Sequence, residues 1–349
     1  MPGPPQDGDE PDLIRTDFKN LESPEWWKSH ALDGVVLYAW GRPKFRNIAR
    51  AIREAGIFLV LNQDNGGLVS PLAGIGEWWE EQWTLCGGAS PAAIRKILRG
   101  LTLGLAITDP LRAVHLHHGD VIACVSPGAA SFYQTLCGFY GGPSLQRRVR
   151  VITHPVEPSF QLDGREKKRQ IICVGRWDDV VQKRPHLMME VIGKMISHDA
   201  DVRVVIAGNA TSEMHGWHRM LAPAARSRVD LAGRLGRAGL AAAMADSQVF
   251  YSPSAYESFG IAAAEGLCSG CSVVAEKSVS MVSFDWFTAA HSGTLAADAS
   301  ASAHVAAISA ELRAWASGTR DADAIARHWQ PLLHADHVAA SILHLAPQP

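Results

Sequence analysis

Several features that would place the chain in a functional class are missing from the sequence. No apolar run approaches the ~20 residues that a membrane-spanning helix requires. The formal net charge is only -2, so no excess of basic residues indicates a nucleic-acid partner. No Gly-x-Gly-x-x-Gly follows an expected strand, which argues against a dinucleotide-dependent oxidoreductase. The sequence therefore predicts neither a transmembrane protein, nor a nucleic-acid binder, nor a dehydrogenase.

Cysteines are few, and nothing in their placement indicates disulfides. We expect all six to be small buried residues in a reducing compartment: Cys86, Cys124, Cys137, Cys173, Cys268 and Cys271. The last two have the spacing of half a zinc site, but no second pair completes it, so we interpret them as structural. Met1 to Pro11 lacks the basic and apolar regions of a signal peptide and is predicted to be a disordered leader. A cytoplasmic location follows as an expectation.

The chain is long enough for two domains. It has 349 residues, of which 47% are hydrophobic and 19% are charged, so it can bury two sizeable cores. The polar stretch before Ile171 is predicted to be the linker. The expected boundaries are a partly disordered leader, a first domain, a linker, a second domain and closing helices at 1–30, 31–154, 155–169, 170–320 and 321–349.

Strands and helices are expected to alternate in both halves, which is typical of parallel sheets covered by helices. The expected strands of the first half are Val35 to Trp40, Ile57 to Asn62, Val121 to Ser126 and Val149 to Thr153. Its expected helices are Pro43 to Ala55, Glu77 to Leu105 with interruptions, and Ala129 to Cys137. The expected strands of the second half are Ile171 to Val174, Val202 to Ala207, Val229 to Ala232, Val249 to Tyr251 and Ser272 to Ala275. Its expected helices are Pro185 to Ile196, Leu240 to Asp246 and Ile261 to Cys268.

The segment from Ser252 to Glu265 combines features of an anion site. A strand ends near Tyr251, a turn rich in Ser and Pro follows, and a helix begins near Phe259. The first turn of a helix has free backbone N–H groups and the positive end of a dipole. Gly260 allows a ligand to approach the backbone. A glutamate in the helix could accept the two hydroxyl donors of a ribose.

This segment resembles the retaining group-one glycosyltransferases of the GT-B fold, through Glu257-x7-Glu265 after Pro-Ser and before a Gly-Cys-Ser-Val-Val strand. The resemblance extends over roughly half of the chain, in the right order. Its other parts are Val174-Gly175-Arg176 with Lys183, the strand and turn Val204 to Asn209, Val229 to Leu235, Val151 to Val156, and a closing segment from His328 to Leu345.

The resemblance implies an α/β fold of two doubly wound, Rossmann-like domains that face a cleft, with a C-terminal helix that crosses back to the first domain. It implies a retaining transfer of a hexose from a nucleotide-diphosphate sugar. Arg176 and Lys183 would stabilise the departing diphosphate, as a metal does in other transferases, and Glu257 would contact the donor sugar or orient a phosphate-binding group. The donor-binding residues would be Gly175, Gly208, Asn209, Arg234, Leu235, Ser258, Phe259, Gly260, Ile261 and Glu265.

No metal or cofactor is expected besides the donor substrate. The acceptor, held by the first domain, is left open as a sugar, a lipid-linked molecule or a small molecule. No nucleic-acid partner is expected, and peripheral contact with a membrane is not favoured. The alternative is a non-catalytic relative that binds a nucleotide-sugar and acts as a partner subunit.

Two departures from the family pattern bear on the site. Six residues separate Arg176 from Lys183, more than is usual in the family, so either the loop bulges or Arg184 shares the role. Glu276-Lys277 stands where the family has a Gly-Gly-Pro-Glu turn. The first domain also has Trp40-Gly41-Arg42-Pro43 in place of a Gly-rich loop.

Other polar groups are interpreted as ordinary surface. This holds for Asp178-Asp179 and for the Asp-x-Asp pairs Asp7/Asp9, Asp199/Asp201 and Asp321/Asp323, none of which closes a buried strand. It also holds for His115, His117 and His118. His154 could lie near the cleft but is not assigned a role.

Two sets of side chains have a functional and a structural interpretation. A stripe of arginines could attract an anionic membrane or acceptor, but an exposed helix face is favoured: Arg42, Arg46, Arg50 and Arg53. A set of tryptophans could stack on sugar rings, but packing in a core or an interface is favoured: Trp26, Trp27, Trp78, Trp79 and Trp83.

Overall fold

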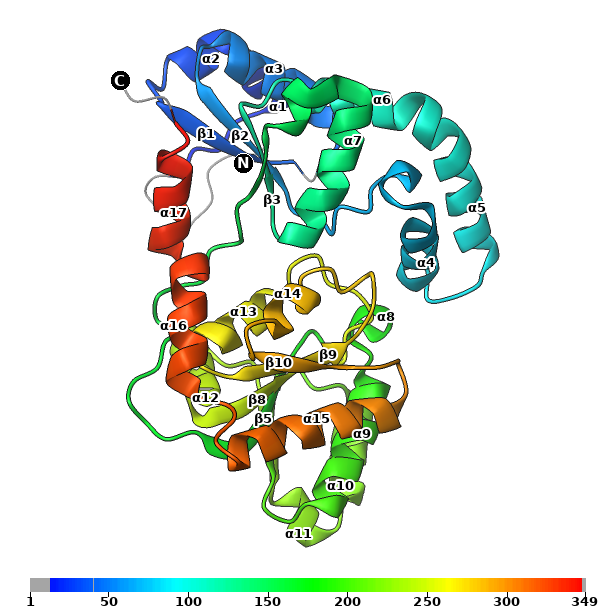
Figure 1. The fold of residues 1–349 in the computed structure, drawn as a ribbon, viewed down its shortest axis with the longest axis vertical. Helices are drawn as coiled ribbons and strands as arrows, with labels where there is room; N and C mark the ends of the chain where they lie inside the picture. The colour runs from blue at the N-terminus through cyan, green and yellow to red at the C-terminus, as the bar shows by residue number, and fades with distance from the viewer. Residues whose placement is uncertain (1–12, 40, 347–349) are drawn as a thin grey trace.

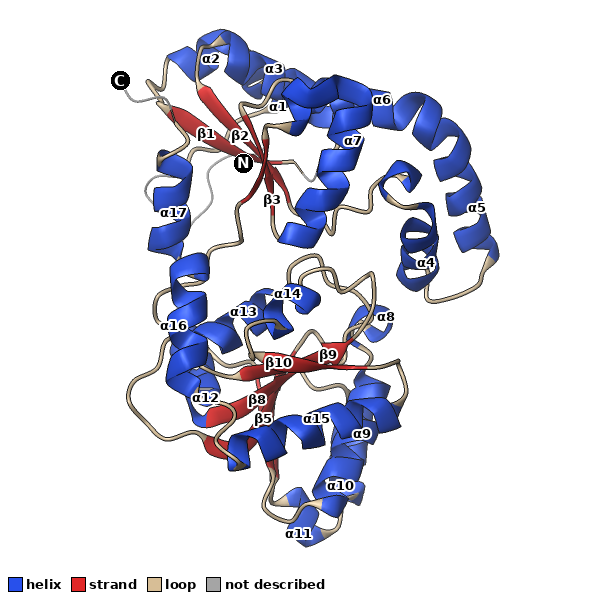
Figure 2. Cartoon of the chain, in the orientation of Figure 1, coloured by secondary structure: helices blue, strands red, loops and turns tan. Residues whose placement is uncertain are grey.

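The computed structural model describes residues 13–39 and 41–346, so the Asp7/Asp9 pair and Trp40 lie outside the described residues. Two parallel sheets form the two halves of the chain (Figures 1 and 2). The first has four strands in the order β1-β2-β3-β4, and every neighbouring pair is parallel. Its strands are β1 (Gly34–Tyr38), β2 (Phe58–Gln63), β3 (Val121–Cys124) and β4 (Val149–Val151).

The connecting helices of the first half are α1 (Phe18–Leu21), α2 (Pro24–Lys28), η1 (Pro43–Phe45), α3 (Arg46–Glu54), η2 (Pro71–Ala73), α4 (Ile75–Leu85), α5 (Pro91–Arg99), η3 (Gly100–Thr108), α6 (Asp109–Leu116) and α7 (Pro127–Gln146). Strands that follow one another in the sheet and run parallel are joined by right-handed crossovers, which place their helices on one face. Ile52 of α3 and Tyr133 of α7 accordingly share a buried core with Leu61 and Ile122 of the sheet.

The opposite face of this sheet is covered from the far end of the chain. Helix α17 (Ala335–Leu343) lies along the first sheet (Figure 1). Its Val338 is buried against Val60, Ala123 and Ile152, and Ile342 packs at the edge of this small core. The expected C-terminal helix that crosses back to the first domain is therefore confirmed.

The second sheet has six parallel strands in the order β10-β9-β8-β5-β6-β7, which is the doubly wound order 3-2-1-4-5-6 within this half. Its strands are β5 (Lys168–Val174), β6 (Arg203–Ala207), β7 (Val229–Gly233), β8 (Ser247–Tyr251), β9 (Ser272–Glu276) and β10 (Gly293–Ala296). Its helices are α8 (Val180–Lys183), α9 (Pro185–His198), α10 (Ser212–Met220), α11 (Pro223–Arg226), α12 (Arg237–Asp246), α13 (Ile261–Cys268), α14 (Phe284–Thr288), α15 (Ala301–Ala316) and α16 (Ala322–Leu333).

The expected fold class is confirmed, but some element bounds differ. Strand β5 begins at Lys168, inside the expected linker. Its first two residues, Lys168 and Arg169, are polar and not buried, so no apolar run marks this start. Strand β10 and helix α15, with mixed Ala, Ser and Gly sequences, were not expected. None of the described helices has the length and apolar character needed to cross a membrane.

The interpretation of the histidine cluster as surface is wrong for His115. This side chain is fully buried in α6, and burial lowers its pKa to about 4, so it is neutral at physiological pH. His115 is buried together with its neighbour Leu116, whereas His117 is exposed, so the three histidines do not share one environment.

Most of the remaining structural interpretations hold. The six cysteines carry no disulfide, and all but the half-buried Cys86 are buried. Trp27 and Trp78 are buried, whereas Trp79 is 41% exposed. The arginines of α3 are exposed, and Arg50 and Arg53 pair with Glu54 and Asp120.

Candidate functional site

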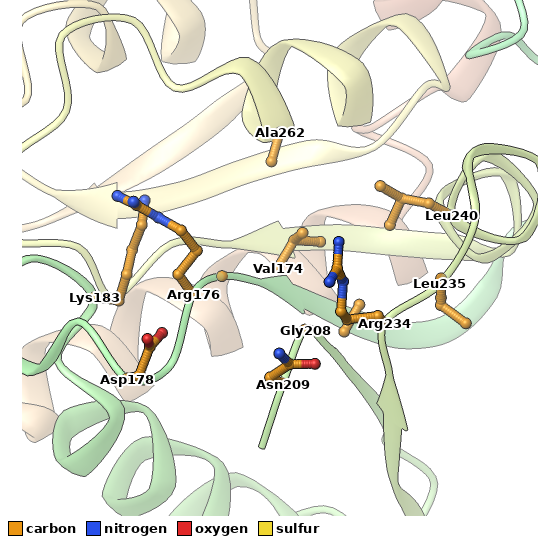
Figure 3. Close-up of a pocket in the computed structure, with 12 residues that line it drawn as sticks. Val174, Arg176, Asp178, Lys183, Gly208, Asn209, Arg234, Leu235, Leu240 and Ala262 are labelled. Carbon is orange, nitrogen blue, oxygen red and sulfur yellow. The ribbon is translucent and has the colours of Figure 1, made fainter. Parts of the chain in front are cut away.

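The strand order of the second sheet places a crevice between β5 and β8. The chain leaves these two neighbouring strands in opposite directions, so the loops at their carboxyl ends separate, and ligands of such sheets bind there. A cavity of about 560 Å³ occupies this position. Figure 3 shows the residues that line it, which come from the ends of β5, β6 and β7 and from α8, α12 and α13: Val174, Gly175, Arg176, Asp178, Lys183, Ala207, Gly208, Asn209, Arg234, Leu235, Leu240 and Ala262.

The long loop after β5 contains the helical turn α8. Trp177 is fully buried and donates its indole N–H to the Ala207 carbonyl at 2.9 Å, which anchors the start of the loop. The Asp179 carboxylate accepts from the Gln182 backbone N–H at 3.1 Å and caps α8. The extra residues thus form a turn that returns Lys183 to the cavity.

Arg184 does not line the cavity that Lys183 lines. Its guanidinium donates to the Pro253 and Ser254 carbonyls at 2.6 and 2.8 Å and pairs with Glu276 at 2.5 Å. Glu276, which stands where the resembled family has a Gly-rich turn, therefore has a structural partner. Of the two alternatives for this loop, the bulge is the one observed.

Lys183 and Glu257 form an ion pair beneath the cavity. The Lys183 ammonium contacts Glu257 Oε1, and both side chains are about 15% exposed. Ser254 donates its hydroxyl to the same carboxylate at 2.8 Å, and the Gln182 amide lies 3.4 Å from its other oxygen. Glu257 therefore orients Lys183, whereas the Arg176 guanidinium, 74% exposed, lies 3.5 Å from the Asp179 carboxylate and donates to the Gln182 side chain at 3.2 Å.

The backbone approaches closely at Gly208. Its φ of +114° is one that side chains rarely adopt, and a Cβ there would lie 1.9 Å from the Gly175 carbonyl oxygen. The turn after β6 therefore requires glycine and sets the position of Asn209. Arg234 and Leu235 follow β7 and lie at the other end of the cavity from Arg176 and Lys183 (Figure 3).

A second cavity of about 320 Å³ adjoins the first, and Val174, Lys183 and Ala262 line both. Glu257, Ser258, Phe259, Gly260 and Ile261 also line it, at the start of α13. Gly260 is the N-cap of α13 with a φ of +85°, and Phe284 packs where its side chain would be. The free N–H groups of this helix end therefore face the cavity.

The first half contributes two residues that sequence reasoning did not assign. His154 follows β4, and its Nε2 lies 2.7 Å from Asp64 Oδ1 after β2. Both line the second cavity, and the His154 ring packs edge-on against Phe259 at 5.4 Å. The two residues are 90 positions apart in the sequence. The only sequence signal for them is that each follows an expected strand of the first half.

Glu265 lies behind the cavities rather than in their lining. It is in α13, 8% exposed, with Arg237 at 3.8 Å. Burial raises the pKa of its carboxyl to about 7, against the lowering effect of Arg237. Ala262, three residues earlier on the same helical face, does line the cavity.

The structure thus brings together every expected site residue except Glu265, and adds Asp64, His154 and Asp178. Asp178 is exposed, as expected, but at the cavity edge. Within the described part of the chain, no group of three or more His, Cys, Asp or Glu side chains could hold a metal ion. The cations that line the cavities are Arg176, Lys183 and Arg234, and the carboxylates are Asp64, Asp178 and Glu257.

A comparison with protein-family models finds a match in the second half of the chain. The family model described as "Glycosyl transferases group 1" matches residues 168–313, from the start of β5 into α15. This segment is therefore a group 1 glycosyltransferase domain. No curated protein sequence matches the chain.

Solved structures extend the comparison to most of the chain. The lipopolysaccharide outer core galactosyltransferase WaaB is 13% identical, with a TM-score of 0.57 over 92% of this chain and 77% of that one. HepE from Anabaena, in complex with UDP and glucose, is 15% identical, with a TM-score of 0.54 over 90% and 78%. Sucrose-phosphate synthase from Thermosynechococcus elongatus is 15% identical, with a TM-score of 0.55 over 96% and 80%. At these identities the similarity shows a shared GT-B fold.

Proposed function

We propose that this chain, whose residues 168–313 form a group 1 glycosyltransferase domain, transfers a hexose from a nucleotide-diphosphate sugar to an acceptor and retains the configuration at the sugar carbon. The observation that carries the proposal is the pair of joined cavities at the carboxyl edge of the second sheet. The larger is lined by Arg176 and Lys183, and the smaller by the first turn of α13. This is an arrangement for a diphosphate with a sugar attached.

Each part of the donor has a matching group. The diphosphate lies between Arg176, Lys183 and the N–H groups of α13, and the base packs against Leu235. Glu265, one helical turn after Ala262 on the same face of α13, is the carboxyl assigned to the ribose hydroxyls. Because two fixed cations stabilise the departing charge, no metal is needed.

The transfer exchanges one bond at the sugar carbon for another. The bond between this carbon and the phosphate oxygen breaks, and the departing diphosphate takes the electron pair. The acceptor hydroxyl oxygen forms the new bond on the same face, and its proton passes to the departing phosphate oxygen. The second cavity, of about 320 Å³, would hold the sugar and is called the sugar cavity below. His154, which Asp64 orients at 2.7 Å, lines it from the first half of the chain and positions the sugar hydroxyls.

Calorimetry with UDP, GDP and ADP tests the donor site. UDP is the first choice because HepE was solved with it. We expect one of the three to bind at micromolar to millimolar concentration. If none binds at millimolar concentration, the proposal is wrong.

Turnover is tested by NMR with UDP-glucose or the matching sugar nucleotide, with and without a chelator. We expect released or transferred sugar with the α configuration of the donor, at the same rate in the chelator. An inverted product would exclude retention, and loss of activity in the chelator would exclude the metal-free mechanism. Tight binding without any product would instead indicate the non-catalytic alternative.

A further inference from the structure

A helical arm extends the first half on the side of the cavities. Helices α4 and α5, together with η3, form it, and Figure 1 shows it projecting beside the first sheet. The loop after α4 reaches the second half, since a Cβ on Gly87 would lie 3.7 Å from Val181 of α8. The arm therefore ends next to the turn that carries Lys183.

A third cavity, of about 440 Å³, lies between this arm and the loop after β2. The same loop serves two cavities, because Asp64 lines the sugar cavity and Asn65 lines this one. A Cβ on Gly66 would lie 3.4 Å from Val282 of the second half and 3.7 Å from Glu81 Oε1 of the arm. The third cavity therefore adjoins the place where the donor sugar would be, on the side away from the diphosphate.

The positive and negative charges of the residues that line the third cavity do not cancel one another. Arg112 pairs with Asp109 at 2.5 Å and donates to the Gly41 and Val69 carbonyls, so this pair is neutral and structural. Lys96 and Arg99 also line the cavity and make no ion pair within the described chain. Burial raises the pKa of the Glu81 carboxyl to about 7, against the effect of Lys96, so at neutral pH it carries only part of a charge.

We propose that the third cavity binds the sugar acceptor through an anionic group, a phosphate or a carboxylate, which Lys96 and Arg99 hold. Arg99 offers a planar fork of donors and Lys96 a point charge, and both suit such oxygens. The acceptor hydroxyl then points past Gly66 toward the sugar cavity. The inference rests on the proposed function only in calling the bound molecule an acceptor.

Such an anion could belong to a soluble sugar phosphate or to a lipid headgroup. The outer side of the same arm exposes four apolar side chains by more than half: Ile94, Leu98, Leu103 and Ile107. Ile94 and Leu98 lie in α5, and Leu103 and Ile107 lie in the nine residues of η3, which form a π-helix. A test therefore needs one soluble probe and one membrane probe.

The soluble probe is glycerol 3-phosphate, with glycerol as its neutral match, titrated at low salt into the full chain in the presence of UDP. The membrane probe is co-sedimentation with phosphatidylglycerol vesicles, with phosphatidylcholine vesicles as the neutral match. The test variant is the double change Lys96→Ala/Arg99→Ala. Arg95→Ala is the matched control, because Arg95 is an exposed cation of the same helix that does not line the cavity.

We expect at least one anionic probe to bind the wild type and the Arg95→Ala variant alike, and to bind the double variant about tenfold or more weakly. Binding of glycerol 3-phosphate would identify a soluble acceptor, and binding of phosphatidylglycerol alone a lipid headgroup. The proposal is overturned if neither anionic probe binds, if the neutral probes bind as well, or if the double variant binds like the wild type.

The affinity for UDP separates this inference from the proposed function. We expect UDP to bind the double variant as it binds the wild type, because Lys96 and Arg99 do not line the donor cavities. If UDP fails to bind the wild type while glycerol 3-phosphate binds and depends on Lys96 and Arg99, the donor assignment fails and the anion site stands.

Discussion

At the scale of single residues, the candidate site depends on paired charges that hold one another in place. Glu257 orients Lys183, Asp64 orients His154, and Glu276 keeps Arg184 away from the cavity. Each carboxylate has its partner on an element distant in sequence. Lys183 is thus held in place before the proposed donor binds, which reduces the cost of ordering it.

Lys183→Ala tests the first of these pairs. The change removes a cation from the diphosphate site and leaves Glu257 without its main partner. We expect kcat/KM to fall by about 10²–10³-fold, as for the loss of one transition-state donor. Lys194→Ala, which breaks an exposed Lys–Glu pair on α9, is the control and should leave the rate unchanged. Steady-state kinetics within threefold of the wild type for Lys183→Ala would contradict the assignment.

Glu265→Gln tests the buried carboxyl through stability. The pKa of Glu265 is raised to about 7 from an ordinary value of 4.5, so the folded chain retains its proton where the unfolded chain has lost it. Its contribution to stability is complete below pH 4.5 and is lost as pH rises through about 7. At pH 8 we expect the ligand-free Gln variant to unfold with a free energy about 2 kcal/mol higher than the wild type.

The same Glu265→Gln variant should bind the nucleoside diphosphate about tenfold more weakly at pH 8, because an amide accepts ribose hydroxyls less well than a carboxylate. Denaturant unfolding at pH 5 and pH 8 and calorimetry measure the two effects. At pH 5 the difference in stability should nearly vanish. Equal stability of both proteins at pH 8 would show that the carboxyl is not destabilised by burial.

At the scale of elements, the site is formed by the turns that follow β5, β6, β7 and β8. The turns after β5, β6 and β8 have local devices that fix them. Trp177 anchors the loop after β5, Asp179 caps α8, Gly208 allows the close approach after β6, and Gly260 caps α13. At the two glycines the device is a backbone feature, so a change there alters the cavity without removing a charged group.

Gly208→Ala is the sharpest change of this kind. A Cβ would lie 1.9 Å from the Gly175 carbonyl oxygen, at a φ of +114°, so both turns must move apart. We expect a loss of about 2 kcal/mol or more in the free energy of unfolding, and loss of nucleotide binding. Gly216→Ala is the matched control, because Gly216 lies in α10 with no atom near its Cβ position.

Thermal unfolding measures the stability of the two variants, and calorimetry measures their affinity for the nucleotide. The control should be unchanged or more stable by up to about 1 kcal/mol, since alanine favours a helix more than glycine does. If Gly208→Ala retained both its stability and its affinity, the close approach of the two turns would have no role in the site.

At the scale of the whole molecule, the two halves are joined by the closing helices. Helix α16 packs on α13 of the second half, and α17 covers the open face of the first sheet. A parallel bridge between Val156 and His334 ties the linker to the junction of the two helices. The first sheet therefore depends on a segment more than 180 residues beyond its last strand.

Val338→Asp tests this dependence. It places an unpaired charge between α17 and the buried Val60 and Ala123. We expect a loss of about 3 kcal/mol or more in the free energy of unfolding. Ala340→Asp, on the exposed face of the same helix, should lose less than about 1 kcal/mol. Equal losses in denaturant unfolding would show that α17 does not cover the sheet.

The sequence by itself determined the repeated alternation of strands and helices, and the order of the motifs in the second half. Apolar periodicity and turn residues are local signals. They therefore predicted closely the bounds of the strands up to β9, which begins at Ser272, and of the helix that begins at Ile261. The short loops after four neighbouring strands also had to meet at one edge of a parallel sheet. For that reason most of the residues that line the two joined cavities could be named before their distances were known.

Tertiary structure decided what depends on packing between distant segments. The spacing of His115 along its helix could not reveal that it is buried, because that depends on how α6 packs. The pairing of His154 with Asp64 and the cavity beside Lys96 arise only when the loops of β2 and β4 and the helical arm come together. Local pattern fixes which face of an element is apolar, but the contacts between elements fix which polar groups share a site.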